Sequence, residues 1–170
     1  MEILKYILPA LVVLLATWIV LYKMLKSEHE KREWVLRKES RKEVIPIRLR
    51  GYERLALLLE RTTPEHMLRD MDVPALTVQQ LQLLLMKTIR MEFDHNLSQQ
   101  IYVSDATWEA IILVEEEMIS FVAAGAQHFA PDSPALPYAQ QLITVYNTNG
   151  QTPNQLAQAK LREEARQLMR

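Results

Sequence analysis

Most of the chain mixes apolar and charged residues, but a long run near the N-terminus carries no charge. Residues 6–22 read YILPALVVLLATWIVLY, and Lys5 and Lys23 bracket them. As a helix this run would be about 25 Å long, and the apolar residues beside it bring it near the ~30 Å hydrocarbon core of a bilayer. Aromatic residues stand near both ends, as in the interfacial belts of membrane proteins, and no small-residue cleavage site of a signal peptide follows. The run therefore predicts a transmembrane anchor over residues 1–25.

A charged stretch follows the anchor and predicts a helical stalk over residues 26–45. Glu28–Arg32 and Glu33–Arg37 are i,i+4 pairs in the favourable order. The apolar residues of this stretch do not repeat every three or four positions, so no coiled-coil seam is expected. A solvated stalk is favoured over a dimerisation helix. Ile45-Pro46 predicts a break after it, because the residue before a proline is pushed out of the α region.

Beyond residue 46, apolar residues recur at helical spacing and β-branched alternation is absent. Good helix formers dominate, and capping residues such as Thr77, Ser104 and Thr152 precede the apolar stripes. The pattern predicts an all-α protein whose anchor and stalk lead into a small bundle of about five helices. The five longer expected helices cover residues 47–61, 78–97, 105–127, 136–147 and 153–170, and a short helix covers residues 64–68.

Prolines at 131 and 134 mark the clearest linker and divide this part of the chain. The expected division is a helical domain over 46–130, then a linker and two C-terminal helices over 131–170. The last helix carries a narrow apolar stripe on a polar rod. It either packs loosely across the domain or awaits a partner's groove.

The distribution of charge predicts which side of the membrane the domain occupies. Residues 23–43 hold eight basic and five acidic residues, a net charge of +3, whereas Lys5 is the only basic residue before the uncharged run. Positive residues stay on the cytoplasmic side, so the expected protein is single-pass in a bacterial inner membrane, with its N-terminus outside and its C-terminal domain cytoplasmic. A periplasmic domain is the alternative. The absence of cysteine agrees with a reducing compartment without requiring one.

The charge of the other segments indicates which classes of partner the protein can bind. Residues 44–130 hold seven basic and twelve acidic residues, a net charge of −5. This net negative charge argues against nucleic acid as a partner, because phosphate binding depends on clustered Lys and Arg. The basic stretch beside the anchor suits anionic lipid head groups.

Signatures of catalysis are absent from the sequence. There is no cysteine, no G-x-S-x-G motif and no glycine-rich phosphate loop among three scattered glycines. The best metal candidate is Glu92-x-x-His95, whose spacing places both residues on one helix face. Di-iron bundles need that motif twice with further glutamates, and it occurs once here. We therefore expect no enzyme, no cofactor and no metal site.

Two polar features stand out instead. Glu115 falls among Trp108, Ile112 and Ile119 at the centre of a helical apolar face, where an unpaired charge would be costly. It is expected to be buried and paired with a residue on a neighbouring helix. The second feature is the polar segment from His95 to Gln100, which either satisfies helix ends or forms a recognition surface. The candidate residues for a buried network or an interaction site are Glu115, His95, Asn96, Gln99 and Gln100.

Two blocks of sequence resemble a known family. Residues 50–64, RGYERLALLLERTTP, and residues 92–104, EFDHNLSQQIYVS, followed by Trp108, are similar to a family of small single-pass membrane proteins of unknown function, found mainly in Bacteroidota. The resemblance extends from the anchor to about residue 130. It implies an inner-membrane protein and brings no catalytic residue with it.

Two classes of function fit these features. The first is a membrane-tethered, non-catalytic interaction or assembly module whose partners are the bilayer and another membrane or cytoplasmic protein, or a second copy of the chain. The alternative is a helical sensor that binds a small molecule or metal around Glu115, His95 and Glu92.

Overall fold

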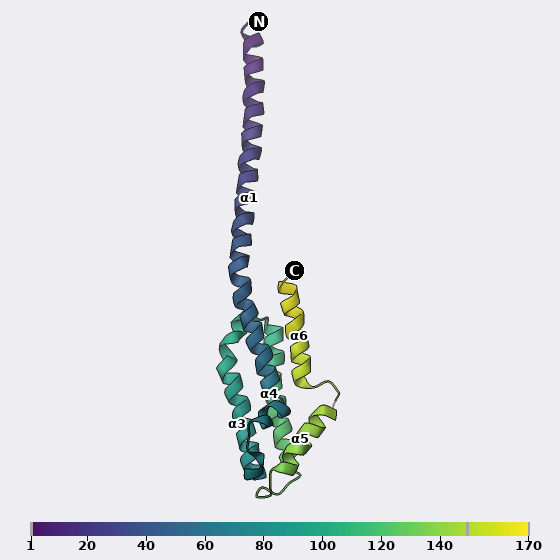
Figure 1. The fold of residues 1–170 in the computed structure, drawn as a ribbon. Helices are drawn as coiled ribbons and strands as arrows, with labels where there is room; N and C mark the ends of the chain where they lie inside the picture. Colours follow the sequence, from purple (N-terminus) through teal and green to yellow (C-terminus); the bar gives the residue numbers. More distant parts are fainter. Residues whose placement is uncertain (1, 149, 170) are drawn as a thin grey trace. The chain divides into compact units, whose positions relative to one another are not determined.

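A computed structural model describes the backbone of residues 2–148 and 150–169, and the side chains of residues 14–15, 17–28, 43–148 and 150–169. Within these residues every regular element is helical and no β-strand is present, so the predicted all-α class is confirmed (Figure 1). The chain divides into two compact units, Met1–Val44 and Ile45–Arg170.

Helix α1 (Glu2–Arg61) covers residues 2–44 of the first unit and residues 45–61 of the second. The break expected at Ile45-Pro46 does not occur. Proline removes one backbone hydrogen bond from a helix, but helix-forming residues on both sides continue it here.

The first unit holds the predicted anchor and stalk. Among the described residues, no helix is long and apolar enough to cross a membrane. Residues 1–13 and 16 of the predicted anchor, and residues 29–42 of the predicted stalk, lie outside the described side chains.

The helices of the second unit begin where the capping residues predict. Thr77 and Thr152 each form a capping box with the glutamine three residues later, and the Ser104 hydroxyl accepts from the backbone N–H of Thr107. These caps satisfy backbone N–H groups that lack partners inside a helix. The elements are α2 (Pro64–Arg69), η1 (Val73–Ala75), α3 (Val78–Asn96), η2 (Leu97–Tyr102), α4 (Asp105–Ala126), α5 (Leu136–Thr148) and α6 (Pro153–Leu168).

The core of this unit is built around α4, which packs against α3, α5 and α6 (Figure 1). Gly125 permits the close approach of α5, because a Cβ atom at this position would lie 2.9 Å from a Leu142 methyl carbon. The Tyr138 hydroxyl adds a buried bond of 2.7 Å to the carbonyl of Val122. The buried stripes of the two longest helices here are Val78, Leu81, Leu85, Ile89 and Phe93 on α3, and Ile111, Val114, Met118, Val122 and Ala126 on α4.

The proline-rich segment is tied into the same core. The carbonyls of Ser133 and Pro131 each accept from a backbone N–H in the first turn of α3, at 3.0 Å, and the N–H of Ala135 donates to Leu76. The boundary expected at residue 131 therefore lies inside the compact unit. Its prolines end α4 but leave carbonyls available to cap another helix, so the segment does not act as a free linker.

Candidate functional site

The densest polar cluster centres on Glu164 of α6. One carboxylate oxygen accepts from the Tyr52 hydroxyl at 3.0 Å and the Ser104 backbone N–H at 2.9 Å. The other accepts from the hydroxyls of Ser104 at 2.7 Å and Thr107 at 2.6 Å. Arg48 completes the cluster with an ion pair of 3.4 Å. The carboxylate thus joins α1, the first turn of α4 and α6.

Electrostatics favour the ionised form of this carboxyl. Burial alone raises the pKa of Glu164, but the hydrogen bonds from Thr107, Ser104 and Tyr52 together outweigh it and hold the pKa below its usual value. The helix N-terminus at Ser104 also favours a negative charge. Burial and the neighbouring carboxylate raise the pKa of Tyr52, so its hydroxyl stays a donor.

Gly51 permits the close packing beside the Glu164 cluster. A Cβ atom at residue 51 would lie 2.7 Å from a ring carbon of Tyr102, which only glycine avoids. The Tyr102 carbonyl accepts from Arg48 Nε at 3.0 Å. The cluster is therefore a packed junction in which the polar groups hold one another.

A second polar contact fixes the other end of α6. The Asn154 amide donates to the Leu59 carbonyl at 2.6 Å and to the Thr62 hydroxyl oxygen at 3.1 Å. A carbonyl can only accept, so this geometry fixes which amide atom is nitrogen. Asn154 Oδ1 is buried and has no partner among the described atoms.

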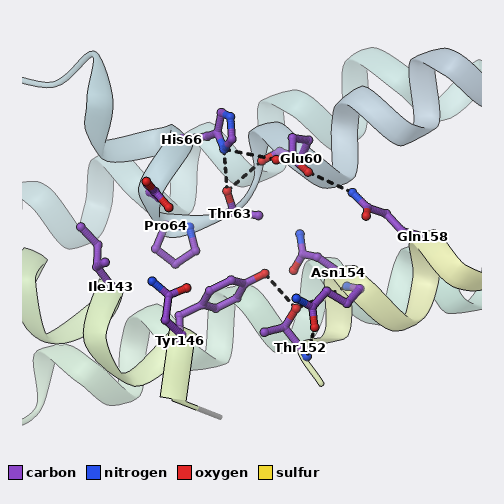
Figure 2. A pocket seen from close by; sticks show the side chains of 12 residues that line it. Glu60, Thr63, Pro64, His66, Ile143, Tyr146, Thr152, Asn154 and Gln158 are labelled. Atoms are coloured by element: carbon purple, nitrogen blue, oxygen red, sulfur yellow. Dashed lines mark hydrogen bonds and ion pairs between the residues drawn. The ribbon is translucent and has the colours of Figure 1, made fainter. Parts of the chain in front are cut away.

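A cavity of about 190 Å³ opens beside Asn154 (Figure 2). Glu60 lies 3.8 Å from His66 Nδ1, and that nitrogen lies 3.0 Å from the Thr63 hydroxyl. The Thr63 hydroxyl, however, donates to the Glu60 carbonyl at 2.9 Å, so its proton is not directed at the imidazole. Thr63 is the N-cap residue of α2. Its side chain makes no capping hydrogen bond, and the direction of the hydroxyl proton does not fit a nucleophile with its base.

Other side chains that line the cavity also form hydrogen bonds with one another. The Tyr146 hydroxyl donates to Thr152 Oγ1 at 3.2 Å, and Gln158 donates to Glu60 at 3.1 Å (Figure 2). Burial raises the pKa of Tyr146, which keeps the hydroxyl a donor. Because these polar groups bond to one another, the cavity presents few groups to a ligand.

An open groove with an apolar floor lies between α4 and α6. It encloses about 540 Å³ over a floor that includes Ala110, Val114 and Ala157. Leu113 and Leu156 flank it and are 52% and 50% exposed. A further hollow of about 300 Å³ shares residues with the groove and extends it along α4 to Phe121.

Glu115, the leading candidate from the sequence, lies at an edge of the core. It is half-buried, and among the described contacts it makes no hydrogen bond or ion pair. Burial and the nearby Asp94 raise its pKa, and Arg90 opposes the shift. The expectation of a buried, paired carboxylate is therefore wrong. The buried stripe of α4 runs through Val114 and Met118, because α4 packs against helices on more than one side.

The polar segment that ends α3 divides between buried and exposed residues. Asn96 and Gln99 are buried, with Asn96 donating to the Glu92 carbonyl at 2.8 Å and Gln99 to Ser98 at 3.1 Å. His95 and Gln100 are exposed. These bonds within the segment fit the interpretation that it satisfies a helix end.

The two candidate metal ligands, Glu92 and His95, each contact an arginine instead. Glu92 lies 3.9 Å from Arg61, and His95 Nε2 lies 3.5 Å from Arg54. Among the described residues, no group of three or more possible protein ligands is close enough to hold a metal ion. No described contact joins His95 to Glu115.

Sequence reasoning missed Glu164 and Asn154. Both lie on the stripe of α6 that faces the core, at spacings of three and four residues: Asn154, Ala157, Leu161, Glu164 and Leu168. Polar residues at the first and fourth positions of this otherwise apolar stripe were the available signal. Their partners are 57 to 116 residues away in the chain, which the local pattern does not reveal.

A comparison with protein families identifies this chain with a known group. The model of a family of unknown function, DUF7935, matches residues 1–168. The chain belongs to this family. The prediction of a family of unknown function, drawn from residues 50–64 and 92–104, is confirmed, while the membrane nature of the family and its link to Bacteroidota stay predictions. Comparisons with curated proteins and with solved structures gave no match.

Proposed function

We propose that this DUF7935 member is a membrane-tethered, non-catalytic interaction module on the cytoplasmic face of a bacterial inner membrane. The observation that carries the proposal is the apolar surface of α1. Leu14 and Trp18 are 67% and 70% exposed, and the other described apolar side chains from Leu15 to Leu25 are also exposed. Contiguous exposed apolar surface is unfavourable in water and suits a lipid environment.

The flanking charges support the orientation. Eight basic residues lie between Lys23 and Lys42, against Lys5 before the apolar run. This bias favours a cytoplasmic second unit and an N-terminus on the other side. The groove between α4 and α6 supports the interaction role, because it keeps leucine side chains exposed beside a well-packed core.

Single-cysteine labelling tests the topology, since the sequence contains no cysteine that would interfere. Ser27→Cys places a thiol just beyond the apolar run, and Glu2→Cys places one before it. In intact spheroplasts a membrane-impermeant maleimide should label Glu2→Cys, whereas Ser27→Cys should react only after the inner membrane is permeabilised. The reverse pattern would contradict the proposed orientation.

Membrane attachment is tested separately by paired lysine substitutions. Leu15→Lys with Leu21→Lys should release the protein from the alkaline-washed membrane fraction, because a charge at membrane depth costs about 3 kcal/mol per residue. Leu57→Lys with Leu83→Lys is the matched control, as both leucines are exposed in the second unit. Recovery of the wild-type chain in the soluble fraction would reject the anchor.

A further inference from the structure

The α4–α6 groove has the dimensions of a helix-binding site. From Ala106 to Phe121 it follows about 22 Å of α4, four turns of a helix. Small side chains line the groove and leave room for another backbone to approach, among them Ala106, Ala110 and Ala159. Leu113 and Leu156 stand at its sides as exposed apolar contacts.

Charge defines the chemistry of its occupant. Glu109 and Glu117 on α4 and Glu163 on α6 line the groove, against Lys160 alone. All four are exposed, and among the described contacts none makes an ion pair or side-chain hydrogen bond. A net negative lining repels anionic lipid head groups and nucleic acid, and it attracts Lys and Arg.

We propose that this groove binds a basic amphipathic helix of a partner protein. Leucine-sized side chains at i, i+3, i+4 and i+7 of that helix would lie over the alanine floor, as in other helix-in-groove complexes. Its Lys and Arg residues would face the three glutamates. The inference deepens the proposed interaction role and rests on it, but it does not depend on the anchor.

Peptide binding tests the groove directly. The protein is the full chain in phosphatidylcholine nanodiscs, with empty nanodiscs as the blank, so that lipid does not attract the peptide by charge. The probe is a designed helix of about 18 residues, or about 27 Å, with leucine on one face and Lys or Arg elsewhere. A second probe keeps the leucines and replaces every basic residue with Glu. The basic probe should bind and the acidic one should not.

Groove variants separate specific docking from general attraction to an acidic protein. Leu113→Glu with Leu156→Glu should weaken binding of the basic probe by about tenfold or more, because two apolar contacts are lost. Leu57→Glu with Leu83→Glu adds the same charge at leucines of similar exposure elsewhere, and should leave affinity within about twofold. Equal affinity for both double variants would overturn the proposal, provided that circular dichroism shows both to be folded.

The salt dependence of binding tests the contribution of the three groove glutamates. Glu109→Gln, Glu117→Gln and Glu163→Gln together should remove most of the salt dependence of binding, since rim charges act mainly through screened attraction. Glu53→Gln, Asp70→Asn and Asp132→Asn remove three exposed charges outside the groove and should leave the salt dependence in place. An unchanged salt dependence in the groove variant would overturn the basic partner.

Two further outcomes are distinguishable. If sedimentation shows a dimer that Leu113→Glu with Leu156→Glu dissociates, the occupant is a second copy and the proposal is wrong. If the chain fails to enter nanodiscs and stays soluble, the anchor is rejected. The same titration is then run in buffer, where binding of the basic probe still decides the groove.

Discussion

Two neighbouring stripes of α6, one residue out of step, differ in how their polar groups are satisfied. The inner stripe runs through Asn154, Ala157, Leu161 and Glu164, and its polar ends bond to α1 and to the start of α4. The outer stripe lines the groove and runs through Pro153, Leu156, Lys160 and Glu163.

The difference shows how one helix can serve two purposes. Most polar groups on the inner stripe are paired, and Asn154 Oδ1 is the exception among the described atoms. A buried polar group without a partner costs free energy, and the paired groups fix where α6 lies. Polar groups on the outer stripe remain hydrated, so leaving them without a protein partner costs little free energy. We therefore expect substitutions on the inner stripe to change stability and those on the outer stripe to change binding.

Removal of α5 and α6 should have the largest effect. A chain covering residues 44–170 should unfold in one cooperative transition, whereas residues 44–130 should lose it, because α4 would expose the face that packs on both helices. Thermal and urea unfolding followed by circular dichroism measure this. A cooperative transition of similar midpoint in residues 44–130 would mean that the C-terminal helices are dispensable, as the proline-rich boundary in the sequence suggests.

Adjacent glutamates offer the sharpest test of the two stripes. Glu164→Ala should lower the free energy of unfolding by about 3 kcal/mol, because it leaves the buried hydroxyls of Tyr52 and Thr107 and the Arg48 guanidinium without their acceptor. Glu163→Ala, one residue away on the exposed stripe, should change it by less than about 0.5 kcal/mol. Urea unfolding of both variants checks the pair, and equal losses would remove the distinction between the stripes.

Acid should weaken the inner stripe selectively. The pKa of Glu164 is lowered in the folded protein, so its contribution is present above the unfolded-state pKa and is lost as the pH falls through the folded one. Between neutral pH and about pH 3, the difference in melting temperature between wild type and Glu164→Gln should therefore shrink. Glu163→Gln should follow the wild type throughout. A constant difference for Glu164→Gln would show that its charge is not what stabilises the junction.

Local patterns predicted the elements well. The caps at Thr77 and Thr152 lie within single turns, and the apolar spacing that predicts α3 lies within one helix, so adjacent sequence is enough to identify them. The predicted stripe of Leu81, Leu85, Ile89, Phe93 and Leu97 is buried except at Leu97. Pro46 was misleading, because proline weakens a helix without always ending it. The segment around Pro131 was misleading for another reason: its carbonyls cap α3, about fifty residues earlier in the chain.

The candidate site was harder to predict, because its contacts are distant in sequence. Glu164 and Asn154 matter through residues of α1 and α4. A helical wheel of α6 places both on its apolar stripe but does not show these partners. The error at Glu115 was the opposite one, because the sequence predicted a buried ion pair that the described contacts do not contain. Its wheel is correct as geometry, but the wheel does not say which part of a wide apolar face meets another helix.

Glu115 supplies the last and smallest expected effect. Burial and Asp94 raise its pKa, so the ionised side chain is less favourable in the folded protein than in the unfolded one. Glu115→Gln should therefore change the free energy of unfolding by about 0.5 kcal/mol or less, in the stabilising direction. Met118→Ala, at a buried position one turn later, should cost about 3 kcal/mol and shows that the measurement is sensitive. A loss of about 2 kcal/mol or more in Glu115→Gln would restore the buried, paired carboxylate that the sequence predicts, because an edge position offers Glu115 no partner whose loss could be so costly.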